Sequence, residues 1–261
     1  MDKTSIIGLI LGFIAIGVGM VLKGVSIMAI VNPAAILIIL LGTVAAVTIA
    51  FPASTLKKVP ALFKILFTEK GQTDTKELIV MFGEWADQTR KEGILALEQK
   101  LAEVKDPFLL SGLQLAIDGQ SPDFIKDIML EKIDAMEQRH EEGAGIFSQA
   151  GTYAPTLGVL GAVIGLIAAL GDMSDIDALG HAISAAFVAT LLGIFTGYVL
   201  WHPFANKLRE KSKKEVVQKE IIVEGILSIT TGDSKMIVRE KLGSLLSSKE
   251  LAEIKQADTN E

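Results

Sequence analysis

Residues 154–170, APTLGVLGAVIGLIAAL, contain no charged side chain, and glycine or alanine recurs along them at helical spacing. A helix rises about 1.5 Å per residue, so a charge-free segment of this length can cross most of a hydrocarbon core of about 30 Å. The small residues fall on one stripe of the helix, where another backbone can approach closely. This segment predicts a transmembrane helix with one face suited to tight packing.

The composition of the whole chain also indicates a membrane protein. Of its 261 residues, 50% are apolar and 21% are charged, and none is cysteine. This is too apolar for one or two ordinary soluble domains, and the apolar residues gather in four segments. We predict four transmembrane helices, at residues 5–22, 33–50, 153–170 and 178–201. The expected fold class is an all-α polytopic membrane protein with a helical cytoplasmic domain.

Basic residues predict the orientation of these helices. They follow the second and the fourth spans, whereas the short connection 171–181 carries three aspartates and no Lys or Arg. Because cytoplasmic loops carry an excess of Lys and Arg, we expect both termini in the cytoplasm and the protein in the plasma membrane. The basic residues are Lys57, Lys58, Lys64 and Lys70 after the second span, and Lys207, Arg209, Lys211, Lys213 and Lys214 after the fourth.

This orientation divides the chain into four segments. A transmembrane hairpin at 1–50 precedes a helical cytoplasmic domain at 51–150, and a second transmembrane hairpin at 151–202 precedes C-terminal cytoplasmic helices and a tail at 203–261. We expect the second hairpin to line any ion pathway.

The cytoplasmic domain is predicted to be helical throughout. Leu78, Phe82 and Trp85 lie at helical spacing with charged residues on the opposite face, and Gly93 ends that helix. A further helix is expected directly after Gly93.

Later helices are predicted from their first residues. Asp106 and Ser121 can each cap a helix, because a proline suited to the first helical position follows each of them. An amphipathic helix is expected to leave the fourth span and to stop at Gly232.

The sequence shows no enzyme motif. It lacks a phosphate-binding loop, an H-E-x-x-H zinc motif and a G-x-S-x-G nucleophile elbow. Because His140, His181 and His202 are scattered, we expect no shared metal site, no catalytic site and no cofactor. With a net charge of −6, the chain is not expected to bind nucleic acid.

The predicted spans carry hydroxyl groups but no charge in their central parts. A proton or cation pathway normally uses an intramembrane carboxylate, because a relay needs a group that changes its charge. The chain therefore either conducts nothing or receives a carboxylate from a partner. The hydroxyl residues in or near the last two spans are Thr156, Ser184, Thr190 and Thr196.

Small residues form a stripe along each of the last two spans, which lets helices approach closely in a bilayer. The two stripes can pack against each other or against a partner helix, and the sequence leaves both interpretations open. The stripe residues are Gly158, Gly161, Ala162, Gly165 and Ala169 in the third span, and Ala182, Ala185, Ala186, Ala189, Gly193 and Gly197 in the fourth.

Four short segments make the chain similar to a known family: APTLGVLGAVIGL, AFVATLLGI, HPFANKLR and TRKEGILALE. With the four spans and the large insertion, they make the chain resemble the MotA family of flagellar motor stator proteins, within the MotA/TolQ/ExbB proton channel group, in its cysteine-free Gram-positive form. The resemblance implies a homo-oligomer, a pentameric ring around a dimer of the partner MotB, whose membrane helix carries an aspartate. It also implies a stator subunit that couples inward proton flow to rotation of the rotor.

The resemblance further implies roles in the membrane. Thr190 resembles the hydroxyl residue that faces the partner's aspartate, and Ala162 and Thr156 belong to the same ion pathway. Pro155 and Pro203 match prolines tied to conformational coupling, although a proline near the membrane surface can simply begin or end a helix. The residues expected to pack against the partner are Gly158, Gly161, Gly165, Ala186 and Gly193.

Arg90 and Glu98, with the neighbouring Lys91, resemble the charged residues that meet the rotor switch protein FliG. They lie on either side of Gly93, so a turn between two helices can display them. Charges on amphipathic helices are also what an ordinary solvated surface carries. Exposed charges suit contact with a rotating partner, because such charges steer encounter and release readily.

Two alternatives to the stator remain. One is a transducer of the ExbB or TolQ type, which has three spans and an outer N-terminus; the hairpin of the first two spans favours the stator. The other is a membrane scaffold without ion coupling. For the coupling ion we predict protons, because sodium-driven relatives have a threonine oxygen where this chain has Ala162.

Overall fold

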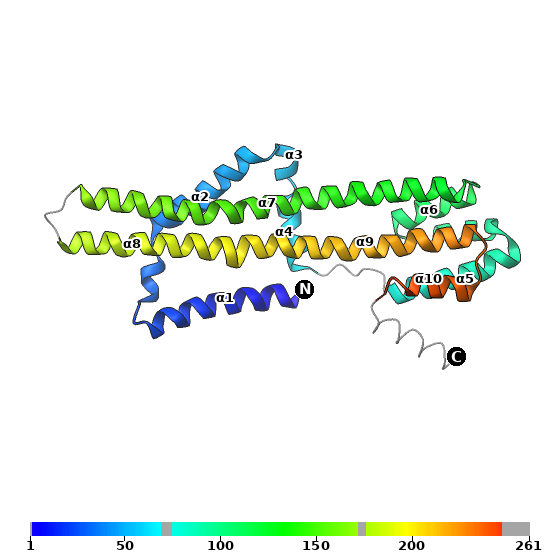
Figure 1. Ribbon diagram of the computed structural model, residues 1–261, viewed down its shortest axis with the longest axis horizontal. Coiled ribbons are helices and arrows are strands. Elements are labelled where there is room, and N and C mark those ends of the chain that lie inside the picture. Colours follow the sequence, from blue (N-terminus) through cyan, green and yellow to red (C-terminus); the bar gives the residue numbers. More distant parts are fainter. Residues whose placement is uncertain (1, 69–74, 172–175, 247–261) are drawn as a thin grey trace. The chain divides into compact units, whose positions relative to one another are not determined.

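Figure 1 shows the computed structural model of the chain, which describes residues 2–68, 75–171 and 176–246. The described residues form helices and no strand, which confirms the predicted all-α class. Lys70, the predicted C-terminal tail and part of the connection 171–181 lie outside these ranges.

The described residues group into two compact units. The membrane unit comprises those of 1–70 and 139–210, and the extramembrane unit those of 71–138 and 211–261. The membrane unit holds α1 (Lys3–Leu22), the 3-10 helix η1 (Ile27–Ile30), α2 (Pro33–Ala50), α3 (Ala53–Leu56), α4 (Val59–Phe67), α8 (Ile176–Phe195) and the π-helical segment η3 (Thr196–Trp201). The extramembrane unit holds α5 (Thr75–Glu92), the 3-10 helix η2 (Ile94–Ala102), α6 (Pro107–Ile117) and α10 (Lys235–Gly243). Two long helices, α7 (Pro122–Leu170) and α9 (His202–Thr230), have residues in both units. The four functional segments expected from the sequence stay a prediction.

The four predicted membrane spans are confirmed. In the described residues, four helices are long and apolar enough to cross a membrane. The second of them, α2, has the bounds that the sequence predicts. It begins there because the Asn32 side chain accepts a hydrogen bond from the N–H of Ala35 at 3.1 Å and Pro33 takes the first helical position.

The third span is not a separate helix. α7 is 49 residues long and passes through Pro155, so the expectation that Pro155 begins or ends a helix is wrong. A proline removes one N–H and crowds the carbonyl four residues earlier, which here belongs to Gly151. That carbonyl lies against the neighbouring helix, where a Cβ on Gly197 would be 2.8 Å from its oxygen. The freed carbonyl is therefore packed against another helix, and α7 continues.

The fourth span ends in a wide turn that the sequence did not predict. α8, η3 and α9 form one helix of 55 residues. In η3, the N–H of His202 donates to the carbonyl of Gly197, five residues earlier, as in a π-helix. Pro203 follows at once, and in a regular α-helix its ring would clash with the carbonyl of Val199. The extra residue in this turn makes room for the proline.

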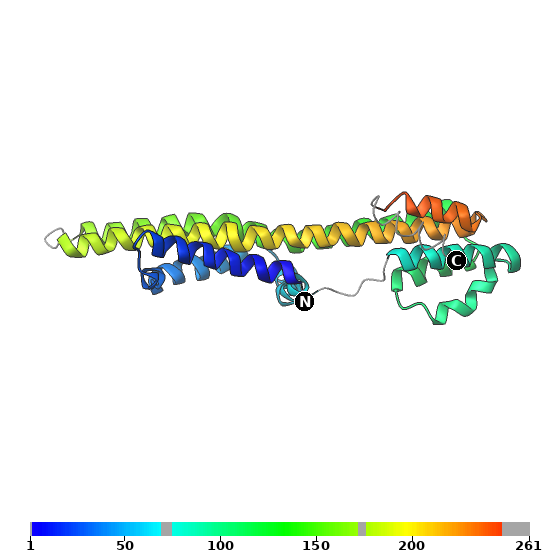
Figure 2. The same cartoon turned by 90° about the horizontal axis from the view of Figure 1, so that it is seen from below.

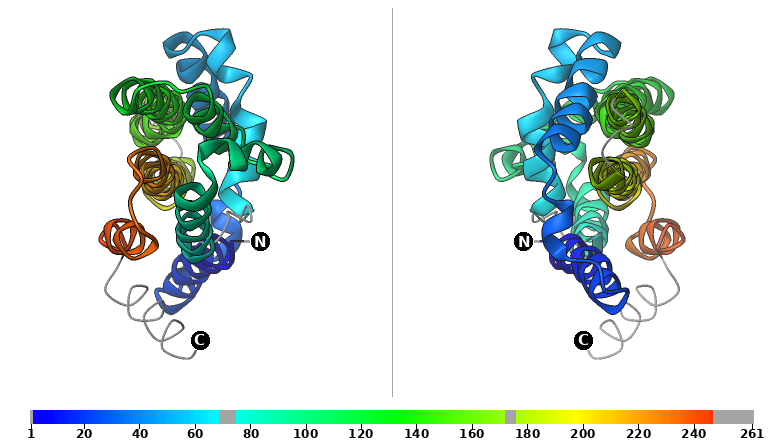
Figure 3. Two further views of the ribbon diagram at one scale, coloured as in Figure 1. Left: turned by 90° about the vertical axis from the view of Figure 1, so that its right-hand side faces the viewer. Right: turned by 90° about the vertical axis from the view of Figure 1, so that its left-hand side faces the viewer.

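The four spans pack together in the membrane unit. α7 and α8 run side by side, and α1 lies along α8 (Figure 2). Phe13 of α1 contacts Phe195 of α8, with ring centroids 5.1 Å apart. α2 contacts α7, since a Cβ on Gly42 would lie 3.1 Å from the Leu157 side chain. The end-on views of Figure 3 show α1 and α2 next to the α7–α8 pair.

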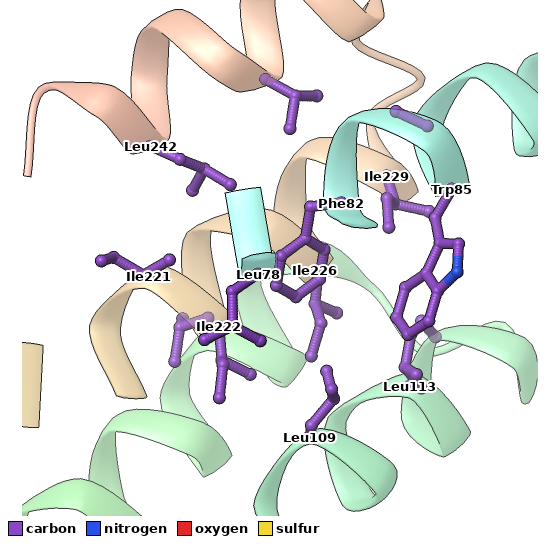
Figure 4. Close-up of a cluster of buried hydrophobic side chains, with 14 of the residues drawn as sticks. Leu78, Phe82, Trp85, Leu109, Leu113, Ile221, Ile222, Ile226, Ile229 and Leu242 are labelled. Atoms are coloured by element: carbon purple, nitrogen blue, oxygen red, sulfur yellow. The ribbon is translucent and has the colours of Figure 1, made fainter. Parts of the chain in front are cut away.

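The extramembrane unit has a core of its own (Figure 4). The predicted core residues Leu78, Phe82 and Trp85 of α5 are buried in it, together with Ile226 of α9. Phe82 packs directly on the α9 backbone, because a Cβ on Gly225 would lie 2.6 Å from its ring.

The local signals of this unit are largely confirmed. Asp106 accepts a hydrogen bond from the N–H of Phe108 at 2.8 Å, and Ser121 accepts one from the N–H of Phe124 at 3.3 Å. Gly93 ends α5 with a φ of +85°, which glycine adopts readily. The helix expected after it is the 3-10 helix η2.

Candidate functional site

A close contact between two backbones in the membrane unit joins two glycines. A Cβ on Gly158 of α7 would lie 2.8 Å from the carbonyl oxygen of Ala189 and 2.9 Å from the Cα of Gly193 of α8. Real Cβ atoms do not approach that closely, so the two backbones touch. This is the packing that small residues permit in a bilayer.

The other stripe residues differ in what surrounds them. A Cβ on Gly161 would meet Ala189 and Ile38 at 3.6 and 3.7 Å, and Ala186 is buried. A Cβ on Gly165 would have nothing within 4 Å.

Gly158 and Gly193 contact each other within the chain, and their expected contact with a partner stays a prediction. Five glycines and alanines are expected to contact a partner. Gly165 is among them, and it has open space beside it.

Thr190 lies on an apolar groove of about 410 Å³ between α1 and the α8–η3 helix. Ile16, Phe187 and Tyr198 are among the groove residues. The Thr190 hydroxyl donates to the carbonyl of Ala186 at 3.1 Å. A hydroxyl has one donor and two acceptor positions, so its oxygen remains able to accept a hydrogen bond or to bind a cation.

Ala162 and Thr156 are placed differently from Thr190. Ala162 is buried on α7, one turn beyond Gly158 on the same face, and offers no oxygen. Thr156 is exposed, donates to the carbonyl of Thr152 at 3.2 Å, and does not line the groove. The structure thus does not bring Thr156 together with Thr190.

The two prolines flank the wide turn η3. Pro155 packs across it from α7, since a Cβ on Gly197 would lie 2.7 Å from the proline ring. Pro203 is exposed and follows the turn directly. The sequence interpretation placed Gly197 in the stripe of the fourth span but missed Gly151, although a small residue opposite a histidine is a usable signal for close helix approach.

The three predicted rotor residues lie on the surface of the extramembrane unit. Arg90 and Lys91 lie at the end of α5 and Glu98 lies in η2, and all three are exposed. Lys91 pairs with Asp87 at 3.3 Å, whereas the described residues show no ion pair for Arg90 or Glu98. Leu95, between them in the chain, is 64% exposed.

Asp2 is a buried charge that the sequence interpretation did not place. It caps α1, lies 3% exposed, and forms an ion pair with Lys207 of α9 at 3.0 Å. Its N–H donates to the carbonyl of Phe67 at the end of α4, at 3.0 Å. The beginning of α1, the end of α4 and the first turns of α9 therefore lie at one end of the membrane unit.

The sequence of this chain is similar to those of known proteins. Residues 100–221 match the MotA/TolQ/ExbB proton channel family. The chain is 63% identical to Motility protein A of Bacillus subtilis over 250 residues, which cover 96% of this chain and 93% of that protein.

Solved structures agree with that comparison. A chain of the flagellar MotAB stator complex from Bacillus subtilis superposes with a TM-score of 0.92 at 62% identity, covering 97% of this chain and 99% of that one. A chain of C. jejuni MotAB superposes with a TM-score of 0.90 at 30% identity, covering 95% and 97%.

Proposed function

The chain belongs to the MotA/TolQ/ExbB proton channel family, and from this premise we propose that its Thr190 groove carries protons through the stator of the flagellar motor. The chain is a multi-pass membrane protein and a stator subunit of that motor, since its similarity to a motility protein and to a stator structure extends over nearly its whole length. Its role is that of a structural and ion-channel component, and we assign no enzymatic step to it.

The proposed partner is a MotB-like protein. Both solved relatives are chains of MotAB structures, which supports an oligomer with such a partner. In our proposal a ring of five copies surrounds a partner dimer, and each partner helix supplies the aspartate that the spans of this chain lack. Gly165, which has open space beside it, is the stripe residue that the proposal assigns to the partner helix.

The chemistry at Thr190 carries the proposal. Because the hydroxyl proton is already donated to Ala186, the Thr190 oxygen acts as an acceptor toward the groove. A protonated partner carboxyl can donate to it, and both this hydrogen bond and the apolar groove favour the neutral form of that carboxyl. The partner's aspartate is therefore protonated while it faces Thr190 and gives up its proton after it moves away.

We further propose that the protein lies in the plasma membrane with both termini in the cytoplasm. The buried Asp2–Lys207 pair places the N-terminal end beside the basic first turns of α9, where cytoplasmic positive charge is expected.

The cytoplasmic charges then face the rotor. Arg90, Lys91 and Glu98 are exposed, and we assign them to contact with the rotor switch protein FliG.

The energy for this motion comes from the ion that crosses the membrane. One charge contributes about 2.3 kcal/mol per 100 mV, which is enough to bias rotation and too little for covalent chemistry. We assign Pro155 and Pro203, on either side of η3, to the coupling between ion flow through the membrane and the contact with the rotor.

The coupling ion provides the test of this proposal. Motor torque is measured at constant proton-motive force while external sodium is varied from micromolar to millimolar levels. We expect torque that is independent of sodium and that stops when a protonophore is added, because Ala162 contributes no side-chain oxygen to a sodium site. Torque that rises with sodium and vanishes on its withdrawal would contradict proton coupling.

A further inference from the structure

The groove at Thr190 has a second polar residue at its far end. Tyr198 lines the same groove, eight residues further along the chain, and its side chain is 64% exposed. Its ring lies 5.3 Å from the ring of His202, measured between centroids. The hydroxyl of Tyr198 and the imidazole of His202 therefore follow Thr190 in order along one helix.

The wide turn η3 supports this alignment. In a regular α-helix, residues four apart are offset by about 40° around the axis, so a row with that spacing turns steadily away from its starting face. η3 places one more residue in the turn that ends at His202, as the hydrogen bond from His202 to Gly197 shows, and this offsets part of the drift between Tyr198 and His202. Thr190 and Tyr198 both line the groove.

His202 is held closely on α7. A Cβ on Gly151 would lie 2.7 Å from Cδ2 of the imidazole, so the ring packs directly on the α7 backbone. Within the described residues, neither imidazole nitrogen of His202 has a hydrogen bond or an ion pair.

The segments next to His202 carry few charged residues. The part of α7 at 147–155 carries no charged residue, and its titratable side chain is Tyr153. On its own helix, Lys207 is paired with Asp2, and Lys64 of α4 is exposed. Histidine is the side chain whose ordinary pKa, about 6.5, lies in the physiological range.

We propose that His202 is the proton acceptor at the inner end of the ion pathway, with Tyr198 between it and the Thr190 groove. A proton released from the partner's carboxyl moves to the Tyr198 hydroxyl, which passes its own proton to a nitrogen of the neutral imidazole. The imidazolium then loses a proton to cytoplasmic water, so that one proton enters, one leaves, and both side chains return to their starting forms. This inference rests on the proposed proton-conducting function.

The test uses the complete stator complex in swimming cells. Torque is measured for His202→Gln while a membrane-permeant weak acid sets the cytoplasmic pH between about 6 and about 7.5, around the histidine pKa. The matched control is His181→Gln, which removes an exposed histidine of α8 away from the groove. Co-purification of the complex shows whether each variant assembles.

We expect His202→Gln to lower torque by at least about threefold at neutral pH and to flatten its dependence on cytoplasmic pH, whereas His181→Gln behaves as the parent. Unchanged torque and an unchanged pH profile in an assembled His202→Gln complex would overturn the proposal. If that variant does not assemble, the torque of Tyr198→Phe tests the proposal, because this variant keeps the ring contact and removes the hydroxyl. Parental torque of Tyr198→Phe would then overturn the proposal.

Failure of the proposed function gives a different result. In that case the parent itself follows external sodium, whatever residue occupies position 202. Failure of the His202 inference alone leaves a proton-driven parent and a proton-driven His202→Gln complex with the same torque.

Discussion

A single hydroxyl distinguishes Thr190 from the apolar residues around it. The hydroxyl donates its proton to the carbonyl of Ala186 in the same helix, so its oxygen presents a hydrogen-bond acceptor to the groove. A similar threonine, Thr48 of α2, also donates to a carbonyl four residues earlier, at 2.7 Å, but is exposed and lies away from the groove.

Removal of the Thr190 oxygen should therefore impair the motor. We expect Thr190→Ala to reduce torque about tenfold, because the neutral carboxyl of the partner loses its acceptor, a change of about 1.4 kcal/mol. Ala162→Ser should have a smaller effect, and Thr48→Ala none. Torque of single motors measures all three, and a Thr190→Ala motor at parental torque would contradict the assignment.

The exposed charges at the end of α5 give a second residue-level prediction. Arg90→Glu and Glu98→Lys should each reduce swimming while the complex still assembles, since neither residue has an ion-pair partner among the described residues. Swimming on soft agar and co-purification are the measurements. Glu131→Lys, an exposed reversal on α7, is the control. Normal swimming of the double reversal would show that the rotor does not bind here.

At the scale of elements, contact between helices depends on which glycines face each other. Gly158 and Gly165 are seven residues apart on one stripe of α7, yet Gly158 touches α8 and Gly165 has open space beside it. Equivalent positions in the sequence therefore have different tolerances for a side chain.

This pair makes a matched test of the α7–α8 contact. Gly158→Ala should destabilise the membrane unit by about 1–3 kcal/mol, because the new methyl group would lie 2.8 Å from the Ala189 oxygen. Gly165→Ala should leave stability unchanged. Thermal unfolding of the purified chain measures both. The larger Gly165→Leu should fold but fail to co-purify with the partner, and normal co-purification would mean that Gly165 faces lipid.

The N-terminus of α6 gives a pH prediction. Burial raises the pKa of Asp106, but hydrogen bonds from Lys219 and the N–H of Phe108, together with the Lys219 charge, outweigh it and hold the pKa below its ordinary value. The Lys219 ammonium lies 2.7 Å from the carboxylate. A depressed carboxyl pKa stabilises the folded state above the unfolded pKa, and this contribution is lost as the pH falls through the folded pKa.

Asp106→Asn should accordingly destabilise α6 by about 1 kcal/mol at neutral pH, since asparagine can cap the helix but cannot pair with Lys219. The difference from the parent should close below about pH 4. Hydrogen exchange of the α6 amides in the complete complex measures this stability difference between the variant and the parent. A difference that persists undiminished in acid would show that the ion pair is not its source.

For the whole molecule, the main feature is that the spans lack a group that can carry a proton across. In the described residues, the central parts of the four spans contain hydroxyls and no Asp, Glu, Lys or Arg. We expect vesicles that contain the purified chain alone to show no proton flux above empty vesicles in a pH-sensitive dye assay. Robust flux without the partner would contradict the need for an inserted carboxylate.

The sequence alone determined the spans and many of the helix ends, because the physics behind them is local. An uncharged run must be long enough to cross the bilayer, and a capping side chain bonds to an N–H two or three residues away. The α2 bounds and the caps at Asp106 and Ser121 were predictable for this reason.

Only the tertiary structure decided the features that depend on a second helix. α7 continues through Pro155, and Gly197, 42 positions later in the chain, packs against the carbonyl that the proline leaves without a donor. Asp2 is buried because Lys207 reaches it from the far end of the sequence. Which glycine of a stripe contacts another helix likewise depends on residues that are distant in sequence and adjacent in space. A periodic pattern along one helix carries no information about its neighbour.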